Sequence, residues 1–190
     1  DEQWGFSARN TDFYDVKSDV EALFWPESIS FKAAPHIALH PGKSSHVFIG
    51  NKVVGWLGEL HPVIQQKLAL SRPVILFELD VNALVQRVVP KAGKIPKYPS
   101  VRRDIAVIVD ENISVDSLLQ GMNVLNLPTV IEISLFDIYR GSGVVDGKKS
   151  LAFRVLLQDT KKTLTDVDAD LVIQKLINIL ETKFQAKLRD

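Results

Sequence analysis

The sequence predicts an α+β protein of two domains, and two features of the chain carry that prediction. Residues 90–99, PKAGKIPKYP, hold three prolines and one glycine, a composition typical of a linker between domains. After this segment, the spacing of the apolar residues predicts the element order β-α-β-β-α-β. We therefore expect one domain at residues 1–89, a linker at 90–99 and a second domain at 100–190.

Charge and composition exclude several classes of protein. Lys+Arg and Asp+Glu number 23 each, so any nucleic-acid binding must be local rather than a property of the whole surface. The absence of cysteine excludes disulfides and thiolate metal sites. No apolar run approaches the roughly 20 residues of a membrane-spanning helix, so we expect no membrane partner, and no signal peptide opens the chain. Because the chain starts at Asp1 without a methionine, we expect a fragment of a longer protein.

The first domain is expected to mix short helices and strands. Apolar residues at Phe13, Val16, Val20 and Phe24 mark one face of a helix that Pro26 ends. The predicted elements are a helix at 12–25, a strand at 29–33, an irregular stretch at 35–47, a hairpin at 47–57 with a two-residue turn at 51–52, a helix from 61, a strand at 73–81 and a short helix at 82–88.

The second domain has a more regular pattern. Its predicted elements are a strand at 100–110, a helix capped by Ser114, strands at 130–139 and 150–158, a helix that opens on a capping box of Thr165 and Asp168, and a short strand at 186–189. This order is the ferredoxin-like pattern, with both helices on one face of a four-stranded antiparallel sheet. RNA-binding modules use such open faces, but small-molecule sensors and metal carriers share the topology.

The hairpin at residues 135–157 holds the candidate binding residues. Phe136 and Tyr139 precede its glycine-rich tip, and residues 139–162 contain six basic side chains against two acidic ones. Aromatic rings among cations suit unstacked bases and the phosphates between them. On composition alone, the alternative of core aromatics and solvated lysines is favoured. Alternation places Leu151, Phe153 and Val155 on one apolar face but does not assign Tyr139, because residues 130–139 are apolar on both sides.

Signatures of catalysis and of metal binding are scarce. The sequence has no phosphate-binding glycine loop, no nucleophile elbow and no zinc-protease motif. His36, His40, His46 and His61 lie close together in the sequence, but prolines interrupt them and no carboxylate stands at zinc-ligand spacing. We expect loop or helix-cap roles for these histidines and no metal site.

Several segments together carry a resemblance to a known family. They include DFYDVKSDVEALF, VGWLGELHPVIQQKL, YPSVRRDIAVIVDENIS, LFDIYRG, GKKSLAFRVLLQDTKKTLTD and FQAKLRD. In order and over essentially the whole chain, they resemble the C-terminal part of the bacterial phenylalanine–tRNA ligase beta subunit. The resemblance implies that residues 1–89 end a catalytic-like domain of inactive class II synthetase fold, an antiparallel sheet domain. It implies that residues 100–190 form a ferredoxin-like anticodon-binding domain.

The resemblance also implies partners and cofactors. It implies a cytoplasmic α2β2 enzyme in which the alpha subunit binds phenylalanine, ATP and magnesium, and it implies tRNA(Phe) as a partner. This chain would then contribute scaffold and subunit interface, with no cofactor and no catalytic residue of its own. The residues agree, because VILFELDVNALVQR lacks the spaced glycines of a class II nucleotide motif and Arg87 lies too late to match its arginine. Phe77, Leu79 and Val81 would obstruct a nucleotide there.

The family's anticodon contacts map onto matching motifs in this chain. Tyr139 in LFDIYRG resembles the aromatic that stacks on an anticodon base, Ser150 in KKSLAF resembles a hydroxyl contact, and Arg189 in AKLRD resembles the cation that closes the site. Weaker candidates are Arg140, Lys149, Arg154 and Arg103, and the neighbour of the last, Arg102. Arg103 has an alternative as a structural partner of Asp104. The alternative for the whole chain is a stand-alone ferredoxin-like RNA-binding or ligand-sensing module.

Overall fold

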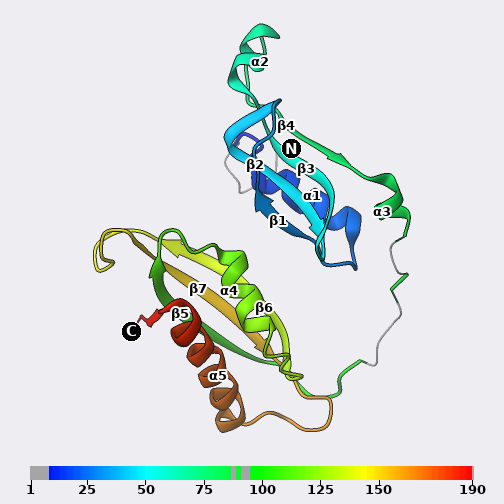
Figure 1. Ribbon diagram of the computed structural model, residues 1–190. Coiled ribbons are helices and arrows are strands. Elements are labelled where there is room, and N and C mark those ends of the chain that lie inside the picture. Colours follow the sequence, from blue (N-terminus) through cyan, green and yellow to red (C-terminus); the bar gives the residue numbers. More distant parts are fainter. Residues whose placement is uncertain (1–8, 87–88, 91–94, 190) are drawn as a thin grey trace. The chain divides into compact units, whose positions relative to one another are not determined.

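The computed structural model describes residues 9–86, 89–90 and 95–189, and the chain divides into two compact units, Asp1–Ala92 and Gly93–Asp190 (Figure 1). The division falls inside the predicted linker at 90–99. Each unit contains one four-stranded antiparallel sheet. No helix in the described part of the chain is long and apolar enough to cross a membrane.

The first unit packs its first helix on its sheet. Its elements are α1 (Phe13–Phe24), β1 (Ser30–Ala33), β2 (Leu39–Ile49), β3 (Lys52–Leu60), α2 (Pro62–Lys67), β4 (Ile75–Leu79) and α3 (Val81–Val85), with the strands in the order β1-β2-β3-β4. Val20 and Phe24 of α1 are fully buried with Val47 of β2 and Leu57 of β3. The predicted helix and the antiparallel sheet are therefore confirmed.

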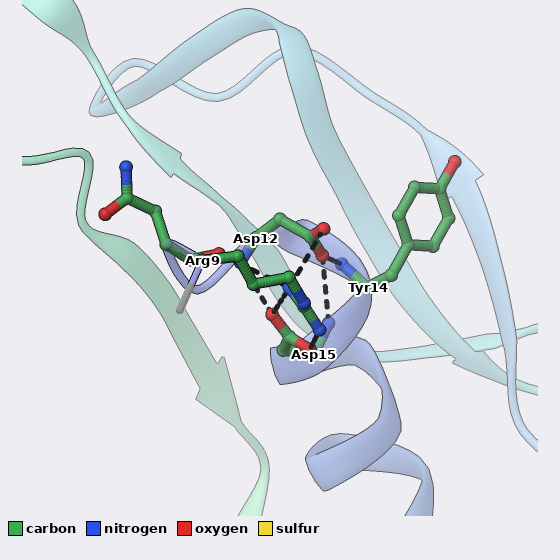
Figure 2. Close-up of polar contacts among 5 residues, drawn as sticks. Arg9, Asp12, Tyr14 and Asp15 are labelled. Atoms are coloured by element: carbon green, nitrogen blue, oxygen red, sulfur yellow. Dashed lines mark hydrogen bonds and ion pairs between the residues drawn. The ribbon is translucent and has the colours of Figure 1, made fainter. Parts of the chain in front are cut away.

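A network of charged side chains fixes the start of α1 (Figure 2). Asp12 is the N-cap and forms a capping box with Asp15, whose carboxylate accepts a hydrogen bond from the Asp12 N–H at 2.8 Å. The Arg9 guanidinium binds the same carboxylate through two nitrogens, one of them 2.7 Å from Oδ2. The hydrogen bonds from Arg9 and, next, from the Asp12 backbone lower the pKa of Asp15 to about 2.

The structure corrects two predictions for β2. The stretch at 35–47 was expected to be irregular, but β2 begins at Leu39 and runs through Pro41. The pairing of β2 with β3 shifts register between Leu39 and Ser44, and such an irregularity accommodates a proline that has no N–H to donate. The hairpin turn is Gly50-Asn51 rather than 51–52, because Ile49 pairs with Lys52. Gly50 has a φ of 56°, which glycine adopts without a steric penalty.

The second unit has the predicted ferredoxin-like order. Its elements are β5 (Val101–Asp110), α4 (Val115–Asn123), β6 (Val130–Tyr139), β7 (Lys148–Leu157), α5 (Asp166–Phe184) and β8 (Lys187–Leu188), and the strand order is β6-β7-β5-β8. Figure 1 shows α4 and α5 on the same side of this sheet. The core contains the predicted apolar face of β7 together with Leu118 of α4 and Leu180 of α5.

One extra residue in β6 decides which face Tyr139 occupies. Leu135 lies opposite Phe153, whereas Asp137 lies opposite Ala152, so Phe136 is a β-bulge. Leu135 and Phe153 pack in the core on the helix side. In a regular strand, Tyr139 would share that side with Leu135, because side chains alternate with a period of two. The bulge reverses the alternation and places Tyr139 opposite Ser150, on the open face that α4 and α5 do not cover.

Candidate nucleic-acid interface

Tyr139, Ser150 and Arg189 come together on the open face of the second sheet. They lie at the end of β6, near the start of β7 and directly after β8. Arg189 donates a hydrogen bond from Nη1 to Ser150 Oγ at 3.2 Å, and its guanidinium carbon lies 4.8 Å from the centre of the Tyr139 ring. The structure therefore brings together the three strongest candidates of the sequence. It combines an aromatic ring, a hydroxyl and a cation in one place.

The loop after β6 positions the Tyr139 ring. Its hydroxyl donates to the carbonyl oxygen of Ser142 at 3.2 Å and lies 3.3 Å from the Ser142 hydroxyl. A Cβ atom on Gly141 would lie only 2.7 Å from the Tyr139 hydroxyl, so a larger residue there would displace the ring from this position. Neither Ser142 nor Gly141 was identified from the sequence as a support of the ring. The signal was the glycine-serine-glycine run directly after Arg140.

Backbone pairing holds the other two side chains. Ser150 is 3% exposed and pairs with Tyr139 on one side and Ile108 on the other. Arg189 follows the two-residue strand β8, and its N–H donates to the carbonyl oxygen of Ala106 at 2.9 Å. In the described part of the chain, no carboxylate lies within ion-pair distance of Arg189. The guanidinium thus keeps hydrogen-bond donors for a ligand.

The weaker candidates divide between the two faces. Arg154 lies on the open face, with its guanidinium carbon 5.3 Å from the centre of the Phe136 ring and its Nε 3.9 Å from Asp104 Oδ1. Arg140 forms an ion pair with Glu111, with Nη2 2.6 Å from Oε1. This hydrogen bond lowers the pKa of Glu111.

Lys149 and Arg103 do not join the three-residue cluster. Lys149 lies opposite Val109 on the helix side, is 8% exposed and donates to the Glu111 carbonyl oxygen at 2.8 Å. Arg103 binds the N-terminal part of α5, with Nη2 2.5 Å from Asp166 Oδ1 and Nε 3.3 Å from Asp170 Oδ1. The sequence offered Asp104 as a structural partner of Arg103. Arg103 does form structural ion pairs, but its partners are Asp166 and Asp170. It is Arg102 that lies near Asp104, at 3.7 Å.

The described residues of the first unit lack the features of a nucleotide site and of a metal site. The strand–helix β4–α3 has no glycine, and Phe77 and Val81 expose 44% and 66% of their surface where a phosphate loop would need open backbone. Arg87 lies outside the described residues. His40 and His61 accept hydrogen bonds from the N–H groups of Gly42 and Val63, the loop and cap roles expected. Within residues 9–86, 89–90 and 95–189, no three metal-ligating side chains gather.

Comparisons with known proteins agree with this architecture. Residues 96–189 match the model of the ferredoxin-fold anticodon binding domain, and residues 1–81 match that of the phenylalanyl tRNA synthetase beta chain CLM domain. The phenylalanine–tRNA ligase beta subunit of Nitrosospira multiformis is 56% identical over 189 residues. The subunits of the same name from Methylococcus capsulatus and Dechloromonas aromatica are 45% and 42% identical, over 193 and 188 residues.

The fold and the family matches together identify the second unit as a ferredoxin-fold anticodon-binding domain. It follows a domain of the synthetase beta chain. The chain belongs to the phenylalanine–tRNA ligase beta-subunit family. These three matches cover 99–100% of this chain and 24% of each relative, so the chain spans about a quarter of the length of the curated relatives it matches. Such matches do not favour a stand-alone module.

Proposed function

We propose that this chain recognises the anticodon of tRNA(Phe) through the open face of its second sheet. The observation that carries the proposal is the convergence of Tyr139, Ser150 and Arg189 from three separate segments onto the one sheet face without helices. The match of residues 96–189 to an anticodon-binding domain supports it.

Each side chain has a distinct part in this proposal. The Tyr139 ring stacks on an unpaired base, which is a common contact in single-stranded RNA recognition. Ser150 Oγ accepts from Arg189 and therefore keeps its own O–H to donate to a base edge. Arg189 lies against the ring and supplies further donors at the rim of the site. Because Ser150 is almost fully buried, its hydroxyl is held at a fixed position, and a base reaches it when the Arg189 side chain moves aside.

The proposal extends to the complete enzyme. The chain acts within a cytoplasmic α2β2 phenylalanine–tRNA ligase, in which the alpha subunit binds phenylalanine, ATP and magnesium. The first unit serves as scaffold and subunit interface. This assignment rests on the family of the chain and on the strand–helix β4–α3, whose residues suit packing better than nucleotide binding.

A titration tests the proposed function directly. We expect the purified chain to bind tRNA(Phe) and to bind a tRNA(Phe) variant with a replaced anticodon more weakly. Free phenylalanine and other free amino acids serve as the comparison for a ligand-sensing module. Equal binding of both transfer RNAs, or saturable binding of an amino acid alone, would contradict anticodon recognition.

A further inference from the structure

The open face carries a second aromatic–arginine pair beyond the cluster around Tyr139. Phe136 is 48% exposed on β6, and the Arg154 guanidinium carbon of the neighbouring strand lies 5.3 Å from its ring centre. The pair repeats the arrangement of Tyr139 and Arg189, whose separation is 4.8 Å. Phe136 is also the bulge residue that turns Tyr139 outward, so one irregularity of β6 presents both rings.

Neither member of the pair is explained by packing. Phe136 is not one of the apolar residues that pack on the core of the second unit, among those the structure describes. Arg154 Nε is buried yet has no hydrogen-bond partner in the described part of the chain, and the nearest carboxylate oxygen, on Asp104, is 3.9 Å away. A half-exposed ring beside a guanidinium side chain that is itself 43% exposed offers a ligand an apolar ring and a planar cation.

The two pairs are spaced for two different bases. Ser150 and Arg154 lie four residues apart on β7, which at about 3.3 Å per residue corresponds to roughly 13 Å. Two pairs this far apart along the strand offer two separate stacking surfaces, and a single base stacks on one of them. Between the pairs, Ala152 and Ala106 present methyl groups on the open face, and Asp137 of β6 lies beside Ala152. Over β7 and β5 an RNA strand can therefore cross from one pair to the other without a bulky side chain in its path, with its phosphates away from Asp137.

We propose that Phe136 and Arg154 form a second subsite for an unpaired base of the same RNA. This inference rests on the proposed function of the face. The subsite accepts a base rather than a phosphate, because Asp104 lies beside Arg154 and Asp137 lies on the same face by register. Their charges oppose a phosphate, whereas an aromatic ring and a guanidinium plane are both surfaces on which bases stack.

The test uses the whole chain and a synthetic stem-loop RNA with the anticodon loop of tRNA(Phe). A fluorescent adenine analogue, 2-aminopurine, replaces one loop nucleotide at a time, and its emission reports stacking. We expect two separate loop positions to respond to binding. Phe136→Ala should abolish the response at one position, keep the response that depends on Tyr139, and weaken binding by roughly five- to 150-fold. Arg154→Gln should affect the same position as Phe136→Ala.

Ile131→Ala is the matched control. Ile131 is the other bulge residue of β6 and is 54% exposed, but its aliphatic side chain has no ring on which a guanidinium or a base can stack. We expect this variant to bind within about twofold of the original chain, as for an ordinary surface substitution. Thermal unfolding of all variants should match, because none of these side chains is buried in the core.

The outcomes separate the inference from the function on which it rests. If the original chain binds and Tyr139→Ala weakens binding, but Phe136→Ala behaves like Ile131→Ala, only the second subsite is overturned. The second subsite is likewise overturned if Phe136→Ala and Tyr139→Ala abolish the response at one shared position. If the original chain does not bind the stem-loop, the proposed function fails and the second subsite fails with it.

Discussion

Arg189 lies over the ring of Tyr139, with 4.8 Å between guanidinium carbon and ring centre, although one residue ends β6 and the other follows β8. The contact joins opposite edges of the sheet order β6-β7-β5-β8 across the open face. Ser150 on β7 links them through its hydrogen bond to Arg189. The candidate site therefore depends on the complete sheet rather than on the hairpin alone.

Tyr139→Ala should weaken binding of tRNA(Phe) by about 1–3 kcal/mol, the usual loss when a base loses its stacking partner. In a complete α2β2 ligase that carries this sequence, the loss should appear as a higher KM for transfer RNA, with amino-acid activation unchanged. Phe153→Ala is the contrast, because Phe153 is fully buried. It should destabilise the unit by about 3–5 kcal/mol and act through folding. Melting of the unit by Tyr139→Ala, with binding per folded molecule intact, would make the ring structural.

Arg189→Ala should cost about 1–3 kcal/mol in RNA binding, with the slope of log K against log salt nearly unchanged. The reason is that the guanidinium lies against Tyr139 and Ser150, beside the position proposed for a base. Arg189→Lys should not restore binding, since an ammonium lacks the planar donor geometry. Ser150→Ala should cost less, about 0.5–1.5 kcal/mol. A fall in the salt slope by about one for Arg189→Ala would instead assign it to a phosphate.

Acid should titrate Asp15 and Asp168 at unusually low pH. The pKa of Asp15 is lowered to about 2 by Arg9, and that of Asp168 to about 2 by Lys162 and then by Thr165. A lowered folded-state pKa gives stability that is present above the ordinary value near 4 and is lost as the pH falls towards 2. Carboxyl NMR shifts measure both midpoints. Arg9→Gln should raise the pKa of Asp15 and leave that of Asp168 unchanged; a shift in both would indicate general unfolding.

The second unit should fold by itself. A shortened chain of residues 95–190 retains the whole core cluster of that unit, with both helices and all four strands. We expect one cooperative unfolding transition and unchanged RNA binding.

Gly55→Ala in the full chain is the complementary variant, because a Cβ there would collide with the Glu78 carbonyl oxygen between β3 and β4. It should lower the melting temperature of the first unit only. Loss of RNA binding in either protein would contradict independent units.

The chain alone should not activate phenylalanine. The strand–helix β4–α3 offers exposed Phe77 and Val81 in place of a glycine-lined phosphate site. Phenylalanine-dependent exchange of pyrophosphate into ATP, measured with the purified chain, should equal that of a buffer control. The complete ligase supplies the positive control. Exchange above the buffer level that is lost on substitution of residues in β4–α3 would place catalysis on this chain.

The sequence pattern sufficed for the elements of the second unit, whereas the choice of Tyr139, Ser150 and Arg189 came from the family resemblance. β6 occupies residues 130–139 as predicted, and the caps at Ser114 and Thr165 form as the capping pattern indicates. The alternation of apolar residues could not predict which face of the sheet Tyr139 occupies. A bulge depends on how two strands pair, and the sequence of one strand does not show it. Alternation with Leu151 and Phe153 does place Lys149 on the helix side, but its hydrogen bond to the Glu111 carbonyl depends on the packing of distant segments and could not be predicted.

The bulges of β6 also affect how one molecule meets another. β6 is the outermost strand of its sheet, and an outer strand offers unpaired N–H and C=O groups to strands of other molecules. Register shifts at Ile131 and Phe136 interrupt that row twice within the strand. An interrupted, twisted row is a poor template for intermolecular β-pairing. The bulges of β6, one of which turns Tyr139 to the open face, thus also make this exposed strand a poor template for aggregation.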